Sequence, residues 1–150
     1  MTTRTTPRSK GFTLLEVLVA MLIVAFGALG LVGLQAVSAK GATDARYRSE
    51  AEILINQLLG RMWVTDRVAA TMNTNFGSSG AGSGYTAWAA DVGSTLPGVV
   101  AGTATAPVVT VNATAGAVTE GTVTVTVFWL APSEAAGTAA HSLTTVAQIT

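Results

Sequence analysis

A long apolar segment lies near the start of the chain. Apolar residues predominate from Phe12 onward, and no charged residue occurs between Val17 and Ala39. An α-helix rises about 1.5 Å per residue and the hydrocarbon core of a bilayer is about 30 Å thick, so roughly 20 residues are enough to cross it. We therefore predict a hydrophobic transmembrane helix over residues 12–39.

The residues before this segment are basic. Arg4, Arg8 and Lys10 precede it without any acidic residue. Positively charged flanks of membrane helices stay in the cytoplasm. We therefore expect the amino terminus to be cytoplasmic and the chain after Lys40 to be exported.

Beyond the apolar segment, hydrophobic residues recur with the period of a helix. One stripe consists of Tyr47, Ala51, Leu54, Leu58 and Met62, with Ile55 and Leu59 beside it. This spacing predicts an amphipathic helix within residues 40–72, extending to about Ala70. The stripe is expected to pack on a sheet, and contact with a partner helix is the alternative.

The pattern then changes to strands. Residues 73–84 are rich in Gly and Ser and predict a flexible surface loop. Alternating residues predict strands over 107–114, 122–130 and 143–149. In the second of these, one face carries Val123, Val125, Val127 and Trp129 and is expected to cover the helix. The predicted fold is α+β: one long amino-terminal helix on a small antiparallel sheet, with residues 73–150 as a β-rich body.

Composition and charge exclude several functions. Apolar residues make up 49% of the 150 residues, and charged residues 11%. All eight basic residues lie at or before Arg67, so we expect no nucleic-acid partner, because phosphate contacts need cations. There is no Cys, and His141 is the one His, so we expect neither a disulfide nor a metal site. His141-Ser142 lacks an orienting acid in sequence, and we predict neither an enzyme nor a cofactor.

One carboxylate interrupts the apolar segment. Glu16 lies four residues after Phe12, and an acid at mid-bilayer costs about 2.5–3.5 kcal/mol by insertion scales. The side chain could reach the lipid headgroups, since it is close to the end of the segment. Alternatively, it could pair with a positive charge, which a cut just before Phe12 would create as a new amino terminus.

The residues Lys10-Gly11-Phe12-Thr13-Leu14-Leu15-Glu16-Val17 resemble the recognition sequence of type IV pilins and of the pseudopilins of type II secretion. The resemblance implies a leader over residues 1–11 and a cut between Gly11 and Phe12 by a prepilin peptidase, followed by methylation of the Phe12 amine. It also implies that Glu16 pairs with the Phe12 amine of a neighbouring subunit and so sets the register of assembly.

The same resemblance implies partners and a location. The partners would be other major and minor pilins, the prepilin peptidase and the inner-membrane pilus assembly machinery. The protein would cross the inner membrane once, with a periplasmic body, and then enter a pilus on the cell surface. Gly27, Gly30 and Gly33 are expected to allow close helix packing.

A narrower resemblance favours a minor pilin. Leu58-Leu59-Gly60-Arg61-Met62 resembles a pattern of PilV-type minor pilins. Two alternatives stay open at this point. One is a type II secretion pseudopilin, which shares the amino-terminal chemistry. The other is an exported binding protein whose ordinary signal peptide is cut after Val37-Ser38-Ala39.

Overall fold

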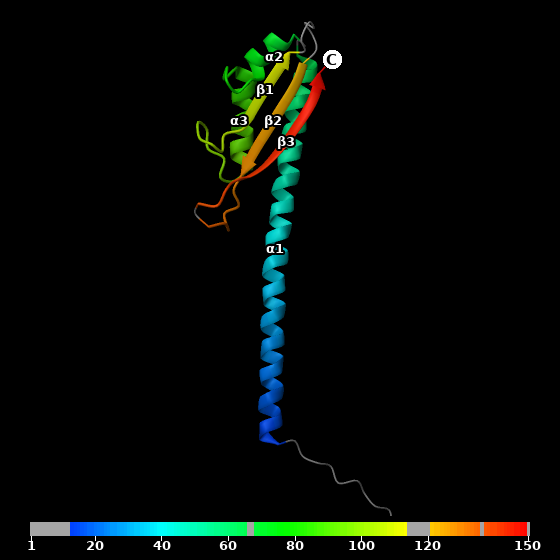
Figure 1. Cartoon of the computed structure of the whole chain (residues 1–150), viewed down its shortest axis with the longest axis vertical. Coiled ribbons are helices and arrows are strands. Elements are labelled where there is room, and N and C mark those ends of the chain that lie inside the picture. Colours follow the sequence, from blue (N-terminus) through cyan, green and yellow to red (C-terminus); the bar gives the residue numbers. More distant parts are fainter. Residues whose placement is uncertain (1–12, 66–67, 114–120, 136, 150) are drawn as a thin grey trace, which may run out of the picture. The chain divides into compact units, whose positions relative to one another are not determined.

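The computed structural model describes residues 13–65, 68–113, 121–135 and 137–149 of the chain. It divides into two units, residues 1–41 and residues 42–150. Helix α1 (Leu14–Val64) belongs to both, and the other elements belong to the second: α2 (Ala69–Phe76), α3 (Ser83–Thr95), β1 (Val108–Ala113), β2 (Gly121–Trp129) and β3 (His141–Ile149). Figure 1 labels these elements.

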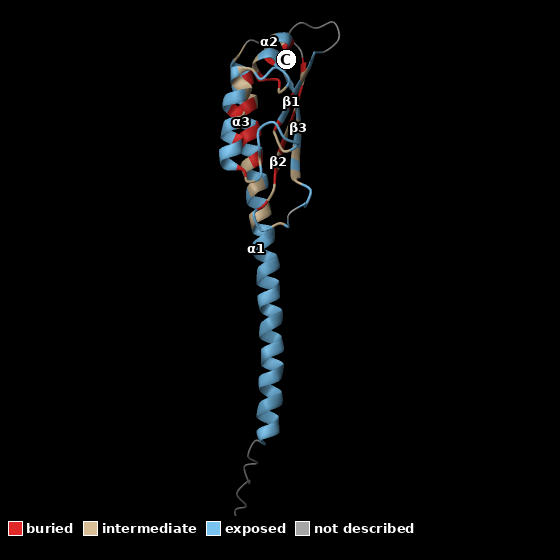
Figure 2. Cartoon of the chain, turned by 90° about the vertical axis from the view of Figure 1, so that its left-hand side faces the viewer, coloured by how far each residue is buried: buried red, intermediate tan, exposed pale blue. Residues whose placement is uncertain are grey.

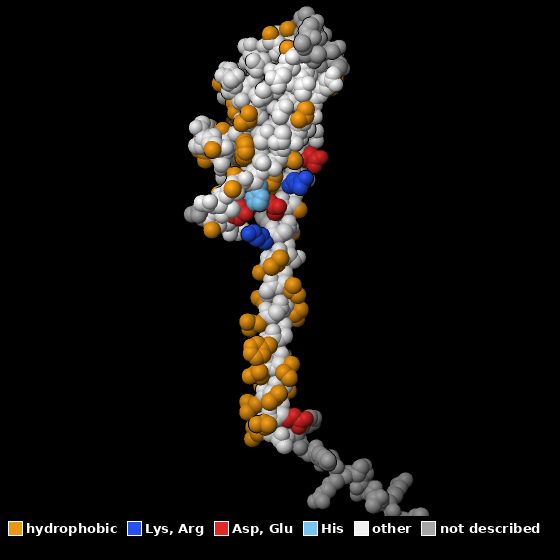
Figure 3. All heavy atoms as spheres, viewed as in Figure 1, with side chains coloured by type: hydrophobic (Ala, Val, Ile, Leu, Met, Phe, Trp, Pro, Cys, Tyr) orange, Lys and Arg blue, Asp and Glu red, His pale blue; other side chains and the backbone are white. Residues whose placement is uncertain are grey.

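The described part of the first unit is helical from Leu14 onward, with no residue buried. Every residue from 13 to 41 is exposed, which Figure 2 shows as unbroken pale blue. Mean hydropathy reaches 2.7 in this stretch, so by length and composition α1 can cross a membrane. Apolar side chains project from it on all the sides that Figure 3 shows.

The second unit has a core between a sheet and helices. The sheet is antiparallel in the order β1-β2-β3, with Val125 of β2 paired to Val109 of β1 and to Thr145 of β3. The buried side chains come from α1 within residues 51–62, from α2, from α3 and from one face of the sheet. This is the predicted α+β fold, a long helix packed on a small antiparallel sheet.

The two predicted hydrophobic faces are confirmed. On α1, the buried members of the stripe are Ala51, Leu54, Ile55, Leu58 and Met62. On β2, the buried residues Val123, Val125, Val127 and Trp129 alternate with half-buried ones. The three strands begin and end within two residues of the predicted bounds.

The predicted extension of the helix to about Ala70 is wrong. Helix α1 ends at Val64, and α2 begins separately at Ala69, so residues 40–72 do not form one helix. At this end the Thr65 N–H donates to the carbonyl of Met62, 3.2 Å away, which tightens the last turn. The Thr65 hydroxyl also donates to the carbonyl of Arg61 at 2.9 Å, so local bonds satisfy carbonyls that a longer helix would have used.

The predicted loop over 73–84 is too long, and one helix was not predicted. Helix α2 continues to Phe76 and α3 begins at Ser83, which leaves residues 77–82 as the connection. Phe76 and Met72 are buried, and this burial extends α2 into the polar stretch. The carboxy-terminal body is therefore less purely β than expected, since α3 contributes the buried Trp88 and Val92.

Candidate functional site

The first turn of α1 is built by Thr13 and Glu16. The hydroxyl oxygen of Thr13 accepts a hydrogen bond from the backbone N–H of Glu16 at 3.4 Å, and its carbonyl accepts from the same N–H at 3.0 Å. A Thr before a helix with a Glu three residues later is a capping-box sequence, in which side chains satisfy the free N–H groups of the first turn. Thr13 thus caps the first turn of the helix, which begins at Leu14.

The Glu16 carboxylate lies at the end of an apolar surface. A shallow groove along the helix is lined by Glu16 together with Val17, Ala20, Met21, Val24, Ala25 and Ala28. In water, an acid in the first turn of a helix is stabilised by about 0.3–1 kcal/mol through the helix dipole. That gain is smaller than the cost of about 2.5–3.5 kcal/mol for an acid at mid-bilayer. The helix dipole alone therefore does not account for a carboxylate within this segment.

Three glycines of the helix have no packing role within the chain. A Cβ atom placed on Gly27, Gly30 or Gly33 would meet no atom within 4 Å. Gly in a helix costs about 1 kcal/mol relative to Ala, so nothing in the described fold compensates for these residues. Small residues allow helices to approach closely in membranes, which is the role predicted for them.

Gly11 and Phe12 lie outside the described residues. The cut between them and the methylation of Phe12 therefore remain predictions. The structure places Glu16 and Thr13 directly after this junction, at the start of the exposed apolar helix.

Comparison with known proteins gives one match. Residues 6–32 match the family model of the prokaryotic N-terminal methylation motif. This range contains the Gly11-Phe12 junction, the capping turn and most of the apolar segment. Over these residues the chain resembles the type IV pilin family. No curated protein and no solved structure matches it.

The motif has direct implications for this pilin-like chain. It is shared by type IV pilins and pseudopilins, and it implies a structural subunit rather than an enzyme. It also implies processing by a prepilin peptidase and interaction with pilus machinery. The apolar helix is consistent with membrane anchoring before assembly.

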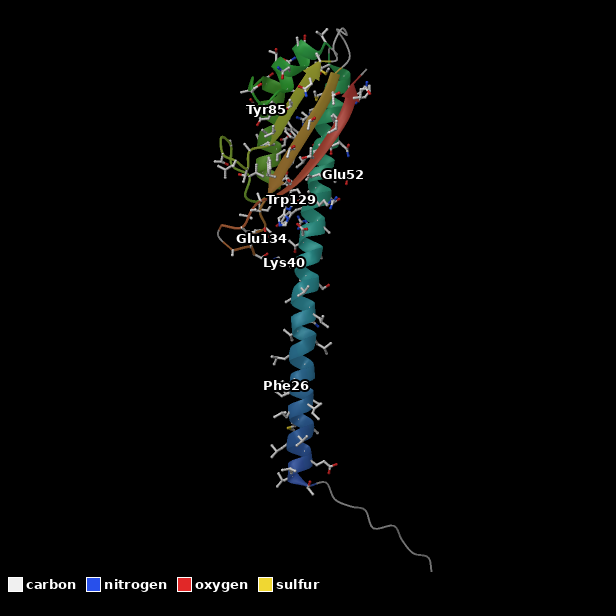
Figure 4. All side chains as sticks on the ribbon, viewed as in Figure 1. Phe26, Lys40, Glu52, Tyr85, Trp129 and Glu134 are labelled. Atoms are coloured by element: carbon white, nitrogen blue, oxygen red, sulfur yellow. The ribbon has the colours of Figure 1, made fainter. Side chains whose placement is uncertain are left out.

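The body of the pilin-like chain contains a polar cluster that sequence reasoning missed. His141 lies between two carboxylates: its Nε2 is 2.9 Å from Oε1 of Glu134, and its Nδ1 is 3.8 Å from Oδ1 of Asp44. Its ring stacks on the indole of Trp129 with a centroid distance of 5.7 Å. The Trp129 indole N–H donates to Asp44 at 3.3 Å. Figure 4 labels Trp129 at the end of β2 and Glu134 in the following loop.

The cluster ties the β2–β3 connection to α1. The second carboxylate oxygen of Glu134 accepts a hydrogen bond from the N–H of Ala131 at 3.1 Å, which closes the turn after β2. Asp44 and His141 are far apart in sequence, so spacing gave no signal for their contact. Glu134 and His141 are only seven residues apart, between the predicted strands over 122–130 and 143–149, and this short separation was the available signal. The cluster holds the β2–β3 connection in position against α1 and offers no nucleophile.

Two further ion pairs lie on the body. Arg46 contacts Glu50 at 2.8 Å one helical turn away, and the hydrogen bond to this carboxylate raises the pKa of the Arg46 guanidinium further above its ordinary value. Arg61 contacts Asp91 of α3 at 3.1 Å. Arg46 is exposed and Glu50 is half-buried in the same helix, whereas Arg61 and Asp91 are both exposed and join α1 to α3. Exposed ion pairs of this kind contribute little to stability. Within the described ranges, no three His, Asp or Glu side chains are grouped to hold a metal ion.

Proposed function

We propose that the chain is a minor type IV pilin, a subunit of the pilus or of its initiation complex. It is made as a precursor, inserted with residues 1–11 in the cytoplasm and the body in the periplasm, and cut between Gly11 and Phe12. The observation that carries this proposal is an exposed apolar helix whose first turn holds a single carboxylate, directly after a Gly-Phe junction within the matched motif. Its partners are other pilins, the prepilin peptidase and the inner-membrane assembly machinery.

The role that we propose for Glu16 is to pair with the Phe12 amine of a neighbouring subunit. A cut at Gly11 leaves this amine positively charged, and the carboxylate lies in the first helical turn that follows it. Removing one partner of a desolvated charge pair is strongly unfavourable even where the pair itself adds little stability. The pair therefore favours one axial register of packed helices over others.

The minor-pilin assignment is supported by the resemblance of residues 58–62 to PilV-type chains. In the structure, Leu58 and Met62 of this pattern are buried in the core and Arg61 pairs with Asp91. The pattern thus contributes to the contact of α1 with the body. A type II secretion pseudopilin is the second candidate, because the matched motif is common to both classes.

The mature amino terminus tests the processing step. We expect intact-mass and terminal-peptide spectrometry of the protein from its own cells to show a chain that begins at Phe12 and carries one added methyl group. Gly11→Val should leave an uncut precursor in the membrane, because a branched side chain replaces the only residue without one at the junction. Ser9→Val, with the same bulk two residues before Gly11, should be processed normally. A mature chain that begins at Lys40 would instead indicate an ordinary signal peptide.

The Glu16 charge is tested separately from the helix cap. Glu16→Gln removes the charge but keeps a side chain that capping boxes accept, whereas Thr13→Val removes the capping hydroxyl and keeps the charge. We expect both variants to be cut. Glu16→Gln should lower the amount in sheared pili about tenfold or more, since 1.4 kcal/mol corresponds to tenfold and a broken desolvated pair costs several kcal/mol.

Thr13→Val should assemble at close to the wild-type level. An equal loss in both variants would show that Glu16 acts through the helix cap and not through its charge. Recovery of the wild-type protein only from the cell envelope, with none in sheared pili, would favour the pseudopilin.

A further inference from the structure

The two edges of the sheet differ in how they are protected. At the β1 edge, the backbone N–H and the hydroxyl of Ser78 both donate to the carbonyl of Val109, at 3.0 and 3.1 Å. Helix α2 also contacts β1, and the Tyr85 hydroxyl donates to the carbonyl of Pro107 just before the strand. Another strand therefore has no access to this edge without displacing these groups.

The β3 edge has no such cover among the described residues. The backbone of residues 142–148 is bonded to β2 on one side, and no other described hydrogen bond involves that backbone. The outward N–H and C=O groups of a strand bonded on one side form a ready template for a further strand. Figure 1 shows β3 as the last strand on its side of the sheet.

The sequence of β3 contains none of the devices that usually protect an edge. Residues 142–148 include no Pro, Gly or charged side chain, and the pairing with β2 runs from His141 to Ile149 without a bulge. Natural proteins protect exposed edges with charges, Pro, bulges or short strands. A nine-residue regular strand without any of these is typical of an edge that another chain occupies.

The side chains of β3 indicate what that chain is like. Ser142, Thr144, Val146 and Gln148 are exposed, while Leu143 packs against the core from the other face. None of the residues in β1, β2 or 142–148 is charged, and Figure 3 shows mainly uncharged side chains over the sheet. An uncharged strand that alternates polar and β-branched residues therefore matches this surface, whereas a charged strand gains no partner on it.

We propose that the free edge of β3 over residues 142–148 is a docking site for an extended, uncharged segment of a different protein, which adds a fourth strand to the sheet. Only an extended backbone supplies alternating donors and acceptors at the spacing of this edge. The His141–Glu134–Asp44 cluster marks one end of the site, because the carboxylates of Glu134 and Asp44 lie there.

A second copy of the chain fits the edge less well. Head-to-tail pairing of copies would join β3 of one copy to β1 of the next, and the covered β1 edge prevents it. Pairing of β3 with β3 of a second copy is the outcome that the dimerisation measurement below detects.

A defined probe is a peptide with the sequence of residues 122–128 and two lysines at each end. This sequence already pairs with β3 in the fold, so its side chains are compatible with the neighbours on that strand. The measurement is backbone hydrogen exchange of the full-length chain in detergent micelles, with increasing amounts of peptide. We expect saturable protection of amides within 142–148 and none from the same peptide carrying Val125→Pro.

Matched lysine variants locate the site. Val146, Thr124 and Thr110 lie in one row across the three strands, with Val146 at the free edge and Thr110 at the covered one. Val146→Lys should weaken peptide binding about fivefold, the upper end of what one cross-strand pair contributes. Thr110→Lys places the same charge at the other edge and should leave binding within about twofold.

Several results would overturn the proposal. One is that the peptide does not protect the amides within 142–148 from exchange, and another is that it protects only amides of the apolar helix. A third is that both lysine variants weaken peptide binding equally. Dimerisation of the wild-type chain that Val146→Lys abolishes would assign the edge to a second copy instead. Each of these results is independent of whether the chain is cut at Gly11, so it leaves the proposed pilin function standing.

Discussion

At the scale of single residues, the polar atoms of the body's aromatic side chains join distant parts of the chain. The indole N–H of the buried Trp88 donates to the carbonyl of Leu54 at 2.8 Å, which ties α3 to α1. The Tyr85 hydroxyl donates to the carbonyl of Pro107 at 2.7 Å, which ties α3 to the start of β1. Among the described side chains, no buried nitrogen or oxygen lacks a hydrogen-bond partner. These bonds fix the register between elements that apolar packing alone leaves free to slide.

Tyr85 gives the body a predictable dependence on alkaline pH. Burial raises the pKa of the Tyr85 hydroxyl above its ordinary value of about 10. Above about pH 10 the unfolded chain therefore loses this proton more readily than the folded one, so the free energy of unfolding falls as the pH rises. Tyr85→Phe should remove this contribution to the loss of stability at alkaline pH. Near pH 7 the free energy of unfolding of the variant should be lower by about 1 kcal/mol, because the hydrogen bond is lost.

Urea unfolding of the wild type and of Tyr85→Phe at pH 7 and near pH 10.5 measures both effects, the higher pH being just above the ordinary tyrosine pKa of about 10. The difference in stability between the two proteins should narrow at the higher pH. A constant difference would mean that the Tyr85 hydroxyl ionises alike in the folded and unfolded chains.

At the scale of elements, strong periodicity made the long helix and the sheet predictable. The α1 stripe and the alternation in β2 each place several large apolar residues on one face, and burying that face stabilises only the element with the matching period. The apolar start of α1 was also predictable, and so was the importance of Glu16 after Gly11-Phe12, but for a different reason. A single carboxylate in such a segment is costly, so it has few explanations.

Helix α3 was not predictable in the same way. Its sequence consists mostly of small residues and contains two large buried side chains, Trp88 and Val92. Tyr85, Trp88 and Val92 follow the helical spacing of three and four residues, but the Gly, Ser and Ala residues around them left this stripe too sparse to be recognised. The contact of Asp44 with His141 was not predictable either, because it depends on how β3 returns past α1. The hydrogen bond between Thr13 and Glu16 was not predicted, although a Thr followed three residues later by a Glu is a local signal for it.

At the scale of the whole molecule, burial is confined to one of the two units. Among the described residues, every buried hydrophobic side chain lies between Ala51 and Ala131, and residues 13–41 are exposed. An apolar helix that is exposed along its length is stable only in a bilayer or against other helices. The second unit, in contrast, contains its own core, its own sheet and its own ion pairs. One chain thus combines an exposed apolar helix with a body that contains its own core.

This division predicts that residues 42–150 fold without residues 1–41. The shortened chain should be soluble in the absence of detergent, because the exposed apolar surface of residues 14–37 is removed. It should also unfold cooperatively, with buried-tryptophan fluorescence like that of the full chain. A chain that begins at residue 48 is the matched control, since it is also free of the apolar segment but lacks Asp44 and the partly buried Tyr47. Trp129 and His141 then lose a partner, and its free energy of unfolding should be lower by about 1–3 kcal/mol. If the chain of residues 42–150 were itself unfolded, the apolar helix would be required for the fold of the body, and the two units could not be treated as independent.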